Sequence, residues 1–227
     1  MQKEIYILRS SASEDHTGFK ERIFGLSRQA VKQYHPLSLK ACLTVKRPPL
    51  VSVIPFRKKK IAVLSVTREQ ASPMDLIVQA DGFAGGYVVE EAIPVAYRKD
   101  WEDGTLTPGV CLLTLFHKKP GLEQETFIRR WHQGHTPLSL RLHPLWNYNR
   151  NVVLRTLDSD YGWYDGIVEE QFRRSSDLLN PLIFFGPPLK TPRHMYQVLK
   201  DTRTFIDMKH METYLAMEVH FLSSARS

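Results

Sequence analysis

The sequence predicts an α+β protein of two successive halves, each with the element order β-α-β-β-α-β, that close together into one barrel. Three observations predict this fold. The apolar residues follow strand and helix periods in the same order twice along the 227 residues. A polar connection at 99–109 separates the two runs. Several residues of the first run also recur in the second at a constant spacing.

The first half begins with a strand at Glu4–Leu8 and continues with an amphipathic helix over Phe19–Tyr34, where apolar residues recur every three or four positions. The pair His35-Pro36 ends this helix, because proline cannot donate to the helix ladder and favours extended geometry in the residue before it. The remaining elements are two strands, a short helix and a last strand, at Leu39–Val45, Ile61–Val66, Met74–Ala80 and Tyr87–Ala92.

The second half repeats this order from a strand at Val110–His117, which is apolar on both faces and is therefore expected to be covered on both sides. Pro120-Gly121 turns the chain into a helix whose apolar side carries Phe127, Trp131, His135, Leu138 and Leu142. Two strands, a proline-bearing apolar insertion, a helix and a last strand follow, at Trp146–Leu157, Asp165–Phe172, Pro181–Pro192, His194–Asp207 and Thr213–Leu222.

The two runs share residues at a spacing of 108 positions (127 − 19 = 108). The pairs are Phe19 and Phe127, Arg22 and Arg130, His35 and His143, and Pro36 and Pro144. We therefore predict an internal duplication into two ferredoxin-like halves, residues 1–98 and 110–227. In such a half the two helices cover one sheet face, so the other face must be buried against a second sheet. One packed pseudo-dimeric unit is expected, as a monomer or as a homodimer.

Composition limits the partners that are expected. The net charge of +7 includes the basic run Arg57–Lys60, but no nucleic-acid-binding motif or interleaved aromatic residues accompany it, so a solvated turn is predicted rather than a nucleic-acid site. No apolar stretch approaches the roughly 20 residues that cross a bilayer, and the first residues lack the features of a secretory signal. Because Cys42 and Cys111 are the two cysteines present, a disulfide framework is not expected. A cytoplasmic location is expected instead.

Four stretches of the second half resemble the EthD family. Lys118–Leu122 (KKPGL) and Phe127–Leu138 (FIRRWHQGHTPL) are similar to its basic Pro-Gly turn and to its helix with an aromatic residue and His-x-Pro-Leu. Tyr164–Glu169 resembles its Asp-Gly third strand, and Asp201–Asp207 its acidic-aromatic second helix. The resemblance covers roughly residues 110–222. Residues 1–109 share it only through the repeat and lack the tryptophan and the His-x-Pro-Leu element.

The resemblance implies a fold more clearly than a reaction. EthD proteins belong to the dimeric α+β barrel superfamily, whose members include cofactor-free monooxygenases, polyketide cyclases, lactone isomerases, dehydratases and haem enzymes. EthD proteins themselves are associated with oxidative degradation and with fungal polyketide pathways. A shared fold does not assign a function, so the candidate residues are weighed individually.

His135 is the first candidate for catalysis. Its spacing from Phe127 and Trp131 predicts one shared helix face against the sheet, where these two aromatic residues would form the wall of a substrate pocket. Pro137 is expected to kink or end the helix beside it. An imidazole can move protons near neutral pH. The alternative is a structural histidine that bonds the backbone and fixes the kink. A metal or haem site with His132 is not expected, because no third ligand stands at a suitable spacing.

Tyr148 is the second catalytic candidate and Asp165 a candidate for substrate binding; a packed tyrosine and a strand-initiating aspartate are the structural alternatives. In the pairs Glu90-Glu91 and Glu169-Glu170, strand alternation sends one carboxylate to each sheet face. One carboxylate of each pair is thus expected inside the barrel, paired with an arginine across the pseudo-twofold axis, because a buried carboxylate is costly without a partner.

The resemblance to the EthD family, taken with these candidate residues, implies a cofactor-free oxidoreductase or lyase without a metal as the first of two expectations. Oxygenation, dehydration and cyclisation each begin with removal of an activated proton, and the expected substrate is a small apolar, aromatic or polyketide-like molecule. The alternative is a non-catalytic, small-molecule-binding or stress-type α+β barrel with an inert His135.

Overall fold

The computed structural model describes residues 1–49, 51–158 and 162–223. The first half consists of β1 (Gln2–Arg9), α1 (His16–Tyr34), β2 (Ser38–Thr44), β3 (Ile61–Arg68), α2 (Met74–Val78) and β4 (Phe83–Val95). The second half consists of β5 (Val110–Phe116), α3 (Gln124–Arg129), the π-helical turn η1 (Arg130–His135), α4 (Thr136–Leu142), β6 (Asn147–Thr156), β7 (Gly166–Phe172), α5 (Ser175–Leu179), α6 (Pro181–Phe184), α7 (Thr191–Thr202) and β8 (Glu212–Leu222). The predicted order of strands and main helices is confirmed. The expected insertion contains the short helix α6 and the start of α7.

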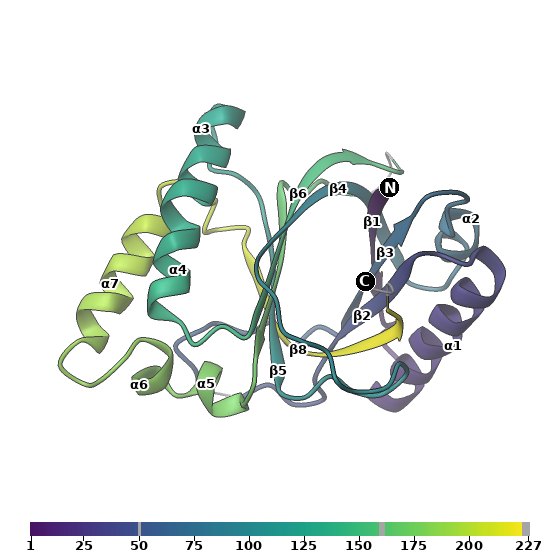
Figure 1. Cartoon of the computed structure of the whole chain (residues 1–227), viewed down its shortest axis with the longest axis horizontal. Coiled ribbons are helices and arrows are strands. Elements are labelled where there is room, and N and C mark those ends of the chain that lie inside the picture. The colour runs from purple at the N-terminus through teal and green to yellow at the C-terminus, as the bar shows by residue number, and fades with distance from the viewer. Residues whose placement is uncertain (50, 159–161, 224–227) are drawn as a thin grey trace.

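The eight strands form one closed antiparallel barrel in the order β1-β3-β2-β8-β5-β7-β6-β4. Each half contributes four adjacent strands, and the two sheets meet at two seams, β2 with β8 and β4 with β6. In Figure 1 the helices α1 and α2 cover the first sheet, and α3, α4 and α7 cover the second on the opposite side of the barrel. Closure removes the exposed strand edges that two separate sheets would present.

The spacing of 108 positions holds for the main helix of each half. Helix α1 begins at His16 and ends at Tyr34, and the continuous segment α3–η1–α4 begins at Gln124 and ends at Leu142. The repeated arginines also make equivalent contacts. Arg22 donates to the Asp81 carbonyl before β4, and Arg130 donates to the Thr204 carbonyl before β8. Each arginine thus ties the main helix to the segment that leads into the last strand of its own half.

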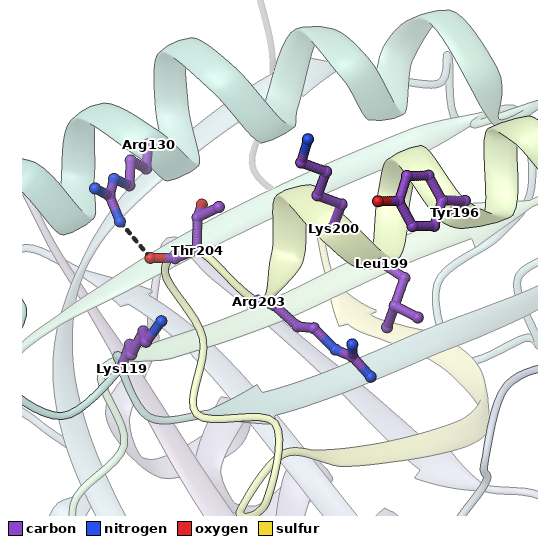
Figure 2. Close-up of a pocket in the computed structure, with 7 residues that line it drawn as sticks. All are labelled: Lys119, Arg130, Tyr196, Leu199, Lys200, Arg203 and Thr204. Atoms are coloured by element: carbon purple, nitrogen blue, oxygen red, sulfur yellow. Dashed lines mark hydrogen bonds between the residues drawn. The ribbon is translucent and has the colours of Figure 1, made fainter.

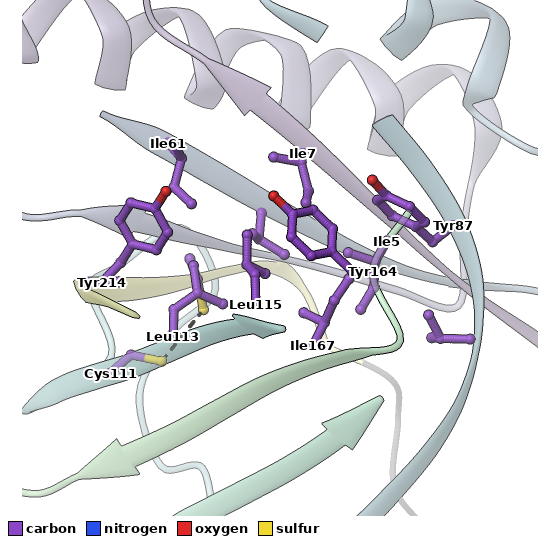
Figure 3. Packing of buried hydrophobic residues seen from close by; sticks show 14 of the residues in the cluster. Ile5, Ile7, Ile61, Tyr87, Cys111, Leu113, Leu115, Tyr164, Ile167 and Tyr214 are labelled. Carbon is purple, nitrogen blue, oxygen red and sulfur yellow. Dashed lines mark hydrogen bonds between the residues drawn. The ribbon is translucent and has the colours of Figure 1, made fainter. Parts of the chain in front are cut away.

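Apolar side chains fill one part of the barrel interior. This cluster has members on all eight strands, among them Ile7, Val63, Leu113 and Ile167, and such a cluster can lie only inside the barrel. Figure 3 shows tyrosines from the second half (Tyr164, Tyr214) and from β4 (Tyr87) packed beside these aliphatic side chains. Separate apolar clusters lie between each sheet and its helices, so most strands are buried on both faces. None of the helices in the described ranges is long and apolar enough to span a membrane.

Candidate functional site

The helix that covers the second sheet is widened by one π-helical turn just before Pro137. The amide of Thr136 donates to the Trp131 carbonyl, five residues back, and the Thr136 hydroxyl donates to the same oxygen at 3.0 Å. We expected Pro137 to kink or end the helix, but the helix continues to Leu142. The wider turn relieves the clash between the proline ring and the carbonyl of the preceding turn, so no break is needed.

The π-turn also changes which residues face the sheet. Trp131 and Thr136 are buried, with 1% and 5% of their surface exposed, whereas the expected partner of Trp131 on this face, His135, is only partly buried. Because the turn holds one extra residue, Thr136 takes the position that an ordinary α-helix would give to His135. The prediction that His135 shares the face of Phe127 and Trp131 was therefore wrong.

His135 lies between its own helix and α7. Its Nδ1 is 2.8 Å from Asp201 Oδ2, and its Nε2 is 3.2 Å from the Ser139 hydroxyl. Its ring also contacts Phe205, with centroids 5.3 Å apart. A tautomer that donates from Nδ1 to Asp201 can accept the serine proton at Nε2. Both ring nitrogens thus have side-chain partners, and the catalytic role of His135 stays a prediction.

Tyr148 and Glu170 lie opposite each other on β6 and β7, on the face of the sheet that the π-turn covers. Tyr148 is 1% and Glu170 8% exposed. Burial raises the pKa of the Glu170 carboxyl to about 7. Burial and the charge of Glu170 raise the pKa of the Tyr148 phenol. A buried carboxyl that titrates near neutral pH beside a phenol is an arrangement suited to proton transfer.

A buried cation, Arg150, lies near Tyr148. The Arg150 Nη1 donates to the Thr136 hydroxyl at 2.7 Å, while its Nε has no hydrogen-bond partner among the described residues. The Nε2 of His132 is likewise buried without a partner in the described chain. Burial and the Arg150 charge lower the pKa of His132 to about 4, so this ring is neutral at pH 7. We call Trp131, His132, Thr136, Tyr148, Arg150 and Glu170 the π-turn cluster.

The structure brings together three of the five predicted site residues. Phe127, Trp131 and Tyr148 belong to one buried cluster between the second sheet and its helices. Asp165 lies at the start of β7, where its oxygens accept from the Lys118 amide at 2.9 Å and from the Trp163 indole at 3.1 Å. These bonds give Asp165 a turn-stabilising role, and its part in substrate binding stays a prediction.

Sequence reasoning did not select Glu170 as a site residue, although it placed one carboxylate of each glutamate pair on each face of the sheet. Glu169 enters the barrel and Glu170 points toward the helices, as alternation requires. The sequence did not reveal that Glu170 is buried, because burial of an outward-facing strand residue depends on helices far away in the sequence.

A second group of buried polar residues occupies the barrel interior. Lys40 Nζ lies 3.1 Å from carboxylate oxygens of both Glu169 and Glu218. Lys3 Nζ lies 2.5 Å from Glu91 and donates to Asn151 at 2.8 Å. The expected carboxylates Glu91 and Glu169 are thus inside the barrel, but their partners are lysines rather than arginines. Glu169 pairs with Lys40 of the other half, whereas Glu91 pairs with Lys3 of its own half. We call Lys3, Lys40, Glu91, Glu169 and Glu218 the lumen ion cluster.

Within the described ranges, Cys42, Glu169 and Glu218 are the one set of three side chains placed closely enough to share a metal ion. The Lys40 ammonium already lies between the two carboxylates, at 3.1 Å from each. A metal ion at this position would have to displace a buried lysine and face its charge. The lumen ion cluster therefore does not fit a metal site.

The fold defined by these elements, a closed α+β barrel of two β-α-β-β-α-β halves, also occurs in solved structures. A candidate monooxygenase from Fusobacterium nucleatum has a TM-score of 0.56 and 11% identical residues, over 96% of this chain and 92% of that chain. An anthrone oxidase-like protein has a TM-score of 0.61 and 10% identity, over 99% and 96% of the two chains. At these identities the similarity establishes the fold alone.

The comparisons with sequences add no family. No family model matches the chain, and no curated protein matches it either. The resemblance to the EthD family accordingly rests on the motif residues of the second half.

Proposed function

We propose that this chain is an acid–base enzyme that removes an activated proton from a small apolar, aromatic or polyketide-like molecule. The observation that carries the proposal is the buried pair of Glu170 and Tyr148, opposite each other on β6 and β7 beneath a π-helical turn. In this proposal the Glu170 carboxylate accepts the proton and the Tyr148 hydroxyl donates a hydrogen bond to the oxygen on which negative charge develops.

The surroundings of the pair support this chemistry. A carboxyl with a pKa of about 7 is divided between its acid and base forms at neutral pH, the condition under which a general base works best. The Arg150 guanidinium lies near Tyr148 and offers a positive charge to an enolate or phenolate. Phe127, Trp131 and Phe205 supply an aromatic wall. Turns of π-helix are frequent at functional sites.

The relatives in fold and the family resemblance point to the same class of chemistry. The two similar structures are named as a candidate monooxygenase and as an anthrone oxidase-like protein, and the EthD-like motifs lie in the half that carries the π-turn cluster. Oxygenation, dehydration and cyclisation share proton removal as their first step. The proposal therefore concerns this step, with His135 retained as a second proton carrier to be tested.

Proton removal can be measured separately from any oxidation. Anthrone carries an activated methylene group, and its exchange with D2O under anaerobic conditions reports deprotonation alone. We expect the protein to accelerate exchange with a rate that rises with pH around 7. Glu170→Gln should lower the acceleration by about 100-fold or more, since general acid–base catalysis contributes about 10²–10⁴-fold.

The control is Glu90→Gln, which alters the exposed glutamate of the Glu90-Glu91 pair on β4 of the first half. This variant should exchange anthrone like the unmodified protein. His135→Ala tests the second carrier, because a proton-transfer role predicts lost exchange with most of the affinity kept. Binding of anthrone without accelerated exchange would instead support the non-catalytic binding protein.

A further inference from the structure

Two adjoining hollows run along the outer face of the second half, between α7 and the helix α3–η1–α4. Their volumes are about 310 and 360 Å³, and both are lined by Lys200 and Thr204. Figure 2 shows that the lining side chains of the first hollow come from the turn before α3, from η1 and from α7 with the loop after it. We call this continuous depression the α7 groove. Its size suits a small organic molecule.

Positive charge dominates the α7 groove. Its basic side chains are Lys119, Arg130, Arg141, Lys200 and Arg203. The acidic residue on its wall, Asp201, is hydrogen-bonded to His135. In the described part of the chain none of the five cations forms an ion pair, so no carboxylate contacts them directly.

In the first half the corresponding arginine is neutralised by a carboxylate of the protein. Arg22, the counterpart of Arg130, donates to both carboxylate oxygens of Glu14 at 2.8 and 2.9 Å. The position corresponding to Glu14 in the second half, 108 residues later, is Leu122. Arg130 therefore donates to the Thr204 carbonyl, as Arg22 donates to the Asp81 carbonyl, but it has no carboxylate in the place of Glu14. Four of its five N–H donors have no hydrogen-bond partner among the residues that the structure describes.

The groove also offers apolar contact. The Tyr196 ring is 66% exposed and the Leu199 side chain 40% exposed, and both line the hollow that contains Arg130. Arginine binds carboxylate and phosphate groups through paired N–H donors, and an exposed ring provides a surface for an aromatic body.

We propose that the α7 groove binds a small molecule with a carboxylate or phosphate group on an apolar or aromatic body. The anionic group binds Arg130 in the way that the Glu14 carboxylate binds Arg22. Lys200 and Arg203 supply further positive charge to the anionic group. The apolar or aromatic body lies against Tyr196 and Leu199. This site is on the outer surface of the helices and is separate from the π-turn cluster beneath them. It stands whether or not the proposed proton transfer is correct.

Binding of 2-naphthoate and 1-naphthyl phosphate, with neutral 2-naphthamide for comparison, tests the proposal by fluorescence titration and calorimetry. We expect both anions to bind, the amide to bind at least 10-fold more weakly, and Lys200→Gln/Arg203→Gln to weaken the anions at least 10-fold. The control Lys58→Gln/Lys59→Gln removes the same charge from the exposed basic run and should change affinity less than twofold. Equal losses in both double variants would overturn the site in favour of unspecific charge attraction.

One further variant and one further binding assay complete the test. Leu122→Glu supplies the carboxylate that the first half carries at Glu14, and it should suppress anion binding while circular dichroism and thermal unfolding show a folded barrel. Unchanged binding in this folded variant would contradict the role of Arg130. Vesicles containing phosphatidylserine distinguish a lipid headgroup from a free molecule. Retention on vesicles without affinity for either naphthyl anion would refute a small-molecule site.

Discussion

Replacing Lys40 by methionine should strongly destabilise the protein, because it leaves two buried carboxylates without their shared cation. Lys40 Nζ is 3.1 Å from both Glu169 and Glu218, whose side chains are fully buried. Removing one partner of a buried ion pair costs about 3–5 kcal/mol. For a chain of this size, 1 kcal/mol corresponds to about 2–4 °C, so Lys40→Met should lower Tm by about 6–20 °C.

The pH dependence of this loss has a definite sign. Burial alone raises the pKa of Glu218, but Lys40 and neighbouring donors outweigh it and hold the pKa well below its usual range. Burial alone lowers the pKa of Lys40, and the charges of Glu169 and Glu218 hold it well above 10.5. The Glu218 contribution is therefore present above about pH 4.3 and lost only as pH falls through the depressed folded value. Without Lys40 the Glu218 carboxylate takes up a proton more readily, so the deficit should shrink between pH 7 and pH 4.

Urea unfolding of both proteins at pH 7 and pH 4 measures the effect. Lys59→Met, at an exposed position in the basic run, should stay within about 0.5 kcal/mol of the unmodified protein. Adding Glu169→Gln and Glu218→Gln to Lys40→Met should restore part of the stability, since the uncompensated charges are then absent. A loss below about 1 kcal/mol for Lys40→Met, or a loss independent of pH, would refute the reasoning.

Two other predictions concern the second half. For Glu170, the folded pKa of about 7 lies above the unfolded value of about 4.3, so the protein should lose up to about 3 kcal/mol of stability as pH rises through this interval. Urea unfolding at pH 5 and pH 8 should show that Glu170→Gln abolishes this loss. If the free energy of unfolding changed equally with pH in both proteins, the raised pKa of Glu170 would be contradicted. In Gly166→Ala, the added Cβ would lie 2.3 Å from Cζ of Phe116, which should cost about 1–3 kcal/mol. Phe116→Leu in that background should recover stability, and a neutral Gly166→Ala in thermal unfolding would show that the ring moves aside freely.

Much of the fold follows from local patterns in the sequence. The order of strands and helices along the chain, the long helix of each half and their spacing of 108 positions were predictable because alternation and helical periodicity are strong over these stretches. The duplication also predicted which sheet faces must meet, since neither half can bury its second face alone. Alternation correctly sent Glu169 into the barrel, but the pattern carries no information on its partner. That partner, Lys40, lies 129 positions away on a strand of the other half.

The details of the candidate site depend on geometry that the sequence does not reveal. The periodicity from Phe127 assumed 3.6 residues per turn and placed His135 on the sheet, whereas the π-turn places Thr136 there. Pro137 signalled an irregularity but not its form, because a proline can be accommodated by a break, a kink or a widened turn. Glu170 resembles any outward-facing strand glutamate until the covering helices are in place.

The lumen ion cluster distributes charge unequally between the halves, and this has a consequence for how the protein can evolve. The first half contributes Lys3, Lys40 and Glu91, and the second contributes Glu169 and Glu218. Two copies of the second half would bring four carboxylates together with no lysine from this set, and two copies of the first would hold an excess of ammonium groups. Each half therefore complements the interior charge of the other. A chain built from two copies of either half would need changes at several of these interior positions to balance the charge.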